Sequence, residues 1–187
     1  MIGKKTMTMT KTYWIERNKT INVDWSAKTV VYCRNIFKHI NIPKGNVVML
    51  GAAYSLALEV LVGQFGKRAM GVDKWNFGNH PQCITEDIFE LDDFDCAFVY
   101  CDVASFSHIA QQNPCPRLTA FEWSLRNLVP GGYCLTRMYG YSDQDMKSTQ
   151  HLMRIVDKHN VTILPIPGNF RGSDWDSKDD VLLRKKG

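Results

Sequence analysis

The sequence predicts an α/β protein built on a doubly wound, mostly parallel sheet. Short apolar runs alternate with helical segments, and such runs are typical of strands that are buried on both faces. The first run, 47–50, leads directly into the small residues Gly51-Ala52-Ala53. The next run ends on Asp73, and a later one ends on Asp102. The βαβ unit that binds a nucleotide-like ligand consists of a strand, a turn of small residues, a helix and a second strand that ends on an acidic residue.

The helices are expected where apolar residues recur at helical spacing. The segment 25–40 has such a face, with Ser26 or Asp24 as its N-cap and Pro43 beyond its end. A second helix, 55–65, follows the small-residue turn, and Gly66 takes the usual place of a C-terminal glycine. Further helices are expected at 114–128 and 143–159.

The strands are expected where apolar residues form short continuous runs. Pro130-Gly131-Gly132 predicts a turn immediately before one of them. The segment 165–177 is rich in Pro, Gly, Ser and Asp and is expected to be an exposed loop. The expected strands are 47–50, 68–72, 83–85, 96–101, 133–138, 161–164 and 181–183.

Length and charge limit the overall organisation. The 187 residues suit one domain, which we place at 21–187 after a flexible N-terminal arm at 1–20. No apolar run approaches the roughly 18 residues that a membrane-spanning helix needs. The formal net charge of +4 permits an anionic partner such as RNA without requiring one. Basic residues near the end of the chain fit either a solvated tail or an RNA-steering role: Arg184, Lys185 and Lys186.

The six cysteines contain no Cys-x-x-Cys pair, and no histidine stands at zinc-finger spacing. Several of the cysteines fall inside expected strands or helices, where a free thiol behaves as a small apolar residue. The sequence therefore predicts reduced cysteines, no structural metal and a reducing compartment such as the cytoplasm.

The turn after the first strand distinguishes between two classes of adenosine cofactor. Nicotinamide enzymes use Gly-x-Gly-x-x-Gly to seat a pyrophosphate on a helix N-terminus. Here the turn has a single glycine, so a pyrophosphate would be poorly held, whereas S-adenosylmethionine has no phosphate. We therefore expect S-adenosylmethionine, with Asp73 accepting hydrogen bonds from its ribose hydroxyls. The expected contacts in the turn are Gly51, Ala52, Ala53 and Tyr54.

Several further segments stand in the order of a known family. After the turn and Asp73 come Thr85-Glu86-Asp87-Ile88, Tyr100-Cys101-Asp102, the strand from Pro130 to Arg137, and Ser177 to Leu183. In this order the chain resembles the FtsJ-like 2′-O-ribose RNA methyltransferases, in particular the viral cap methyltransferases at the end of nidovirus replicase polyproteins. The resemblance covers roughly residues 22–185.

The resemblance implies a single Rossmann-like S-adenosylmethionine methyltransferase domain with an antiparallel last strand. It implies that Asp87 contacts the adenine and that Asp102 lines the cofactor site. It also implies a viral mRNA capping role in the host cytoplasm, with capped RNA and a protein subunit as partners. Trp75, Phe170 and Trp175 are aromatic residues that either stack on bases or pack on their own domain.

The family's active site is a Lys-Asp-Lys-Glu tetrad. By resemblance its positions fall on Lys28, Asp102, Arg137 and Asp180, with Asp179 as the alternative to Asp180. In this chemistry a lysine takes the proton of the ribose 2′-hydroxyl while the oxygen attacks the methyl group. The carboxylates orient the cations.

Two departures from the tetrad leave the activity open. Arg137 stands where the family has a lysine, and a guanidinium stays protonated and is a poor base. An aspartate replaces the glutamate. Either Lys28 is the base and Arg137 an electrostatic clamp, or the domain has lost its chemistry and binds RNA or a replicase partner. A methyltransferase with another acceptor is the further alternative, although no Asn/Asp-Pro-Pro-Tyr motif for base amino groups follows Asp102.

Overall fold

The computed structural model describes residues 23–52, 56–76, 79–102, 116–137, 150, 153–167 and 180–187. The expected N-terminal arm, 1–20, lies outside them. The elements in chain order are α2 (Val23–His39), β1 (Asn46–Leu50), α3 (Leu56–Phe65), the 3-10 helix η1 (Gly66–Arg68), β2 (Ala69–Asp73), β3 (Cys83–Thr85), β4 (Cys96–Cys101), α4 (Pro116–Arg126), β5 (Leu128–Arg137), β6 (Val161–Leu164) and β7 (Asp180–Lys185). Residues 153–158 are also helical.

The seven strands form one sheet in the order β3-β2-β1-β4-β5-β7-β6. Every pairing from β3 to β5 is parallel, and β7 runs antiparallel between β5 and β6. This arrangement confirms the predicted mostly parallel sheet with an antiparallel last strand. The strand order reverses between β1 and β4, and ligands of such sheets bind at the carboxyl ends of the strands beside that point.

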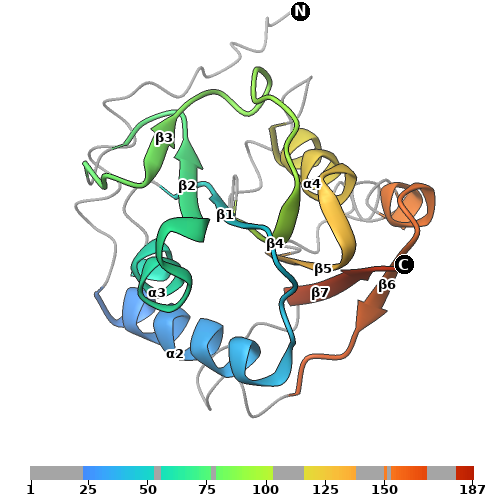
Figure 1. Ribbon diagram of the computed structural model, residues 1–187, viewed down its shortest axis with the longest axis horizontal. Coiled ribbons are helices and arrows are strands. Elements are labelled where there is room, and N and C mark those ends of the chain that lie inside the picture. The colour runs from blue at the N-terminus through green and yellow to red at the C-terminus, as the bar shows by residue number, and fades with distance from the viewer. Residues whose placement is uncertain are drawn as a thin grey trace, which may run out of the picture.

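Helices cover both faces of the sheet. α2 and α3 lie together on one side and α4 on the other (Figure 1). The first side packs Ile36 and Leu61 against Met49 and Phe98, and the second packs Trp123 against its own set of strand residues. All six residues of β4 are buried, which explains why its sequence is a continuous apolar run.

Most expected elements appear within one or two residues of their predicted bounds, but the turn at 130–132 was wrong. β5 already begins at Leu128, and its pairing with β4 shifts between Cys96 and Phe98. Gly131 has φ +77°, which favours glycine, and the residues of this segment form an irregularity within the strand. A Cβ on Gly132 would lie 2.9 Å from the carbonyl oxygen of Val129. The same small, turn-forming residues serve a bulge as well as a turn.

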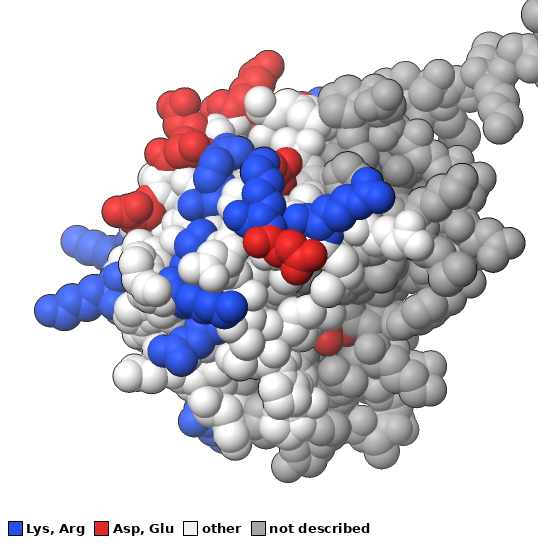
Figure 2. Space-filling view, turned by 90° about the vertical axis from the view of Figure 1, so that its right-hand side faces the viewer, with Lys and Arg blue, Asp and Glu red and all other residues white. Residues whose placement is uncertain are grey.

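The side of the molecule that carries β6 and β7 is rich in Lys and Arg side chains (Figure 2). Several acidic side chains gather at the upper left of this view beside basic ones, and another acidic group lies among the basic side chains near the centre. Within the described part of the chain, no helix combines the length and apolarity that crossing a membrane requires.

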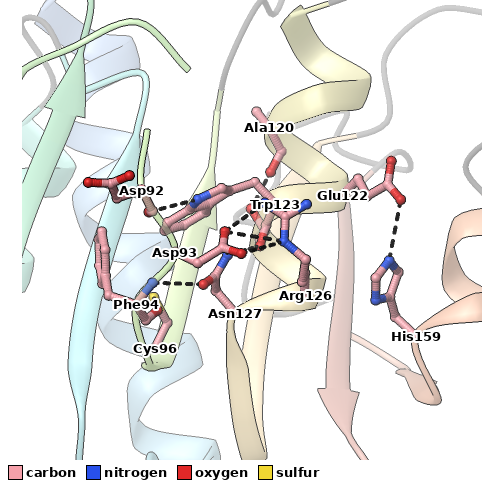
Figure 3. Close-up of polar contacts among 11 residues, drawn as sticks. Asp92, Asp93, Phe94, Cys96, Ala120, Glu122, Trp123, Arg126, Asn127 and His159 are labelled. Carbon is pink, nitrogen blue, oxygen red and sulfur yellow. Dashed lines mark hydrogen bonds and ion pairs between the residues drawn. The ribbon is translucent and has the colours of Figure 1, made fainter. Parts of the chain in front are cut away.

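A network of hydrogen bonds fixes the start of β4 to the end of α4 (Figure 3). The Asn127 side chain accepts from the Phe94 N–H at 2.8 Å and donates to Asp93 Oδ1 at 3.0 Å and to the Trp123 carbonyl at 2.9 Å. Arg126 donates to both carboxylate oxygens of Asp93. Trp123 Nε1 donates to the Asp92 carbonyl at 3.2 Å. These bonds set the position of β4, whose far end carries Asp102.

Candidate functional site

The turn after β1 is held by the end of β2. The N–H groups of Gly51 and Ala52 both donate to the carbonyl of Val72, at 2.9 and 3.3 Å. Gly51 has φ +80°, a conformation that an L side chain rarely adopts. Ala53 and Tyr54, the other two expected contacts in this turn, lie outside the described residues. The turn thus begins at the carboxyl edge of the sheet, next to the reversal of strand order.

Gly71 lets the turn lie close to β2, and sequence reasoning missed it. A Cβ on Gly71 would stand 2.7 Å from the Cβ of Ala52 and 2.7 Å from Cδ2 of Leu58. Both neighbours are buried. A glycine inside a strand pattern signals such a close approach, and that signal was present in the sequence.

Asp73 ends β2 at the same edge. Its Oδ1 accepts a hydrogen bond from the Trp75 N–H at 3.0 Å, and its carbonyl accepts one from the Glu86 N–H at 2.9 Å. Because Leu50 is in register with Val72, Asp73 stands beside Gly51 on the neighbouring strand. The turn and the acid that were expected to share a ligand are therefore adjacent.

Asp87 lies after β3 and is engaged by a lysine. Its Oδ2 accepts from Lys74 Nζ at 2.7 Å, and its Oδ1 accepts from the Phe89 N–H at 3.2 Å. Partial burial raises the pKa of the Asp87 carboxyl, but the hydrogen bonds from Lys74 and Phe89 and the charge of Lys74 outweigh it, so the pKa is lowered overall. Lys74 Nζ also lies 5.8 Å from the centre of the Trp75 ring. Sequence reasoning missed Lys74, which joins the two expected cofactor segments after β2 and β3.

Three of the four tetrad positions stand side by side across the sheet. The Asp102 N–H donates to the Leu50 carbonyl at 3.1 Å and so extends the pairing of β1 with β4. Cys101 pairs with Thr136, which makes Asp102 and Arg137 the next positions on β4 and β5. Arg137 in turn pairs with Asp180 on β7. Neighbouring strands lie about 4.8 Å apart, so the backbones of these three residues span only about 10 Å.

The row alternates acid, cation and acid. Asp180 is buried at 7% exposure, and Asp102 is half-buried. A buried carboxylate is costly unless cations or hydrogen-bond donors face it. The register places the cationic residue Arg137 between the two acids. The side chains of Arg137 and Lys28 lie outside the described part; Lys28 belongs to the first turns of α2.

Within the described part of the chain, the site includes neither a metal-binding cluster nor a disulfide. Among the described residues, no group of three His, Cys, Asp or Glu side chains could hold a metal ion. Five cysteines are described and all are free thiols: Cys33, Cys83, Cys96, Cys101 and Cys134. Burial, with a smaller contribution from Asp73, raises the pKa of the Cys83 thiol to about 11. The Cys83 thiol therefore stays protonated at neutral pH. Cys83 lies on the strand next to the one that ends at Asp73.

Solved structures that match this chain include several methyltransferases. One from Clostridium acetobutylicum matches with a TM-score of 0.61 at 11% identity, over 94% of this chain and 97% of its own. Magnesium protoporphyrin IX methyltransferase from Synechocystis PCC 6803, with bound S-adenosylmethionine, matches with a TM-score of 0.59 at 12% identity, over 97% and 88%. CalS10 from Micromonospora echinaspora, an amino pentose methyltransferase, matches with a TM-score of 0.57 at 8% identity, over 98% and 100%.

These likenesses establish the fold. No protein family model matches the chain, and no curated protein matches it either. The chain has the Rossmann-like fold of S-adenosylmethionine-dependent methyltransferases, as the sequence predicted. The acceptors of the matched proteins differ, so the acceptor of this chain has to be argued from its own residues.

Proposed function

We propose that this protein is an S-adenosylmethionine-dependent methyltransferase that modifies a ribose 2′-hydroxyl at the cap of a viral mRNA. The observation that carries the proposal is the row of residues at the carboxyl edge of the sheet. Gly51 and Asp73 stand on one side of the strand-order reversal, and Asp102, Arg137 and Asp180 stand on the other. The first pair suits a nucleoside, and the second set suits a hydroxyl acceptor.

The features around Asp73 support S-adenosylmethionine as the cofactor. Its carboxylate is half-buried and held by the Trp75 N–H, so it is oriented before a ligand arrives. The tight turn at Gly51 lies beside it and contributes small residues. The family resemblance assigns Asp87 to the adenine. One of its carboxylate oxygens is engaged in the ion pair with Lys74. Matched structures were solved with S-adenosylmethionine or S-adenosylhomocysteine bound.

The proposed chemistry uses Lys28 as the general base. When bound, S-adenosylmethionine supplies an electrophilic methyl group. Lys28 Nζ would accept the 2′-hydroxyl proton as the ribose oxygen takes the methyl group, and the cofactor would leave as its neutral thioether. Lys28 must be neutral for this step, so the proposal requires neighbouring positive charge and partial burial to lower its pKa. Arg137 itself stays charged, and its backbone position lies between the two aspartates of the row.

Methyl-transfer experiments test the assignment. The protein is incubated with S-adenosylmethionine labelled in its methyl group and a short capped RNA, and the control RNA already carries 2′-O-methyl groups at its first nucleotides. We expect label in the first RNA and none in the second. Label in both would show another acceptor on the RNA and contradict the 2′-O assignment.

Variants on one helix separate the base from a general effect of charge. Lys28→Ala should abolish transfer while S-adenosylmethionine still binds, whereas Lys38→Ala, an exposed lysine at the other end of α2, should retain activity. Arg137→Lys should preserve or raise the activity because it restores the family's usual residue. If wild type is inactive and Arg137→Lys alone is active, the domain is a non-catalytic relative.

A second candidate function follows from Arg137. Its permanent charge at the usual base position favours a domain that binds RNA or a replicase partner without catalysis. A protein subunit is part of either proposal. One matched structure, from Haloferax volcanii, is a complex of a candidate methyltransferase with the Trm112 activator, and another, from Clostridium thermocellum, is a candidate rRNA-methylase.

A further inference from the structure

A basic groove lies at the opposite end of β7 from Asp180. It has a volume of about 500 Å³, within the usual range of ligand sites. It runs between the irregular segment of β5, strand β6 and the end of β7. The residues that line it are Pro130, Gly131, Thr162, Leu164, Arg184, Lys185, Lys186 and Gly187.

Three of these residues are cations, and none of the described lining residues is acidic. Lys185 is held in place, because its Nζ donates to the carbonyl of His159 at 2.8 Å. Arg184 and Lys186 are exposed, so their charges face the solvent. The positive charge of the groove therefore comes mainly from these two side chains.

Arg184 is preorganised to meet an anion. Its guanidinium carbon lies 5.7 Å from the centre of the Tyr133 ring, which supports it through a cation–π contact. Gly131 also lies close to it, since a Cβ there would stand 3.9 Å from Nη2 of Arg184. A planar guanidinium with an accessible edge binds a phosphate through two hydrogen bonds.

The groove and the candidate active site are linked by one strand. Asp180 and Arg184 are four residues apart on β7, and residues two apart in a strand share a face, so both belong to the same face of the sheet. Four residues of strand span about 14 Å. That length corresponds to about four stacked nucleotides, at about 3.4 Å each.

We infer that this groove binds the phosphate backbone of the RNA whose ribose is presented at Asp102 and Asp180. The inference rests on the proposed function, since it assumes an RNA acceptor. Cations in a groove whose described lining includes no acidic residue suit a polyanion, and the open groove suits a chain that continues beyond it. Phosphate contacts position the RNA and carry no sequence information, so the groove raises affinity for any RNA sequence.

RNA binding without cofactor tests the groove separately from methyl transfer. Fluorescence anisotropy measures the dissociation constant of a 12-nucleotide RNA at 50 and 200 mM salt for wild type and for Arg184→Glu/Lys186→Glu. Each phosphate contact to single-stranded RNA contributes about 0.7 to the slope of log K against log salt. Loss of two contacts should therefore shrink the affinity ratio between the two salt concentrations about sevenfold, and weaken binding at 50 mM by more than tenfold.

Two further variants keep the result interpretable. Lys67→Glu makes the same kind of charge change at an exposed residue of η1, beside β2 and far along the sheet from β7, and should leave the salt dependence unchanged. Lys186→Glu alone avoids disturbing the contact of Arg184 with Tyr133, and should shrink the ratio about 2.6-fold. Thermal melting and sedimentation of each variant record folding and self-association.

Each outcome decides the inference. It is overturned if wild type does not bind RNA at 50 mM salt, or if the Lys186 variant binds with the salt dependence of wild type. A change in sedimentation without a change in RNA binding would assign the groove to a second copy of the chain and also overturn it. RNA binding that depends on the groove, in a protein that transfers no methyl group, would support the inference and refute the catalytic part of the proposed function.

Discussion

Replacing Gly71 by alanine should both destabilise the protein and displace the turn after β1. The added Cβ would stand 2.7 Å from two buried carbon atoms, on Ala52 and Leu58, where carbon atoms normally approach to about 3.5–4.0 Å. Neither neighbour is the far end of a flexible exposed side chain, so β2 or the turn must shift by close to 1 Å. Overpacking of this kind costs about 1–3 kcal/mol.

Urea unfolding measures the cost, and Gly63→Ala is the matched control. Gly63 lies inside α3, where an added Cβ meets nothing within 4 Å, so alanine should stabilise the protein by about 0.5–1 kcal/mol. For Gly71→Ala, a loss of about 2 kcal/mol corresponds to a melting temperature about 4–8 °C lower. Calorimetric titration should also show weaker S-adenosylmethionine binding by folded Gly71→Ala. Equal stability of Gly71→Ala and wild type would refute the packing argument.

Three further predictions concern other parts of the fold. Asn127→Ala should lower the free energy of unfolding in urea by about 1–3 kcal/mol, because it leaves the Phe94 N–H without its acceptor. Arg126→Ala removes only an exposed ion pair and should cost less than about 1 kcal/mol. Burial, with a smaller contribution from Asp95, raises the pKa of the Cys96 thiol from 9.0 to about 12. The protonated thiol therefore makes its full contribution to the free energy of unfolding below pH 9, and this contribution is lost as the pH rises toward 12. Wild type should lose about 1.4 kcal/mol more than Cys96→Ala between pH 8 and 10, and an equal decline would contradict the assignment. Asp73→Ala should weaken S-adenosylmethionine binding about tenfold by calorimetry, with the exposed Glu90→Ala unchanged as control.

The sheet was predictable because its strands are buried on both faces. The expected strands 83–85, 96–101 and 161–164 agree with β3, β4 and β6, and the acids at Asp73 and Asp102 stand at the strand ends as expected. Burial forces continuous apolar runs, and these are visible in a single sequence. The antiparallel direction of the last strand followed from the resemblance to a known family rather than from the pattern itself.

Features that depend on distant contacts could not be predicted in the same way. The ion pair of Lys74 with Asp87 requires the loop between β2 and β3 to bring both residues together. The bulge at Gly131 uses the residues of a turn, and only its pairing with β4 distinguishes the two. The groove beside Arg184 exists because β7 enters between β5 and β6, which no local pattern reveals.

The position of β7 also sets the order in which the molecule can be completed during synthesis. β5 and β6 have no direct pairing with each other, and both are joined through β7, whose residues follow them in the chain. The pair of Arg137 with Asp180 therefore forms only after residue 180 has left the ribosome. A nascent chain that ends earlier lacks both Asp180 and the part of the basic groove that β7 lines. The β7 residues that we assign to the acceptor are thus synthesised last, after the half of the sheet that carries Asp73.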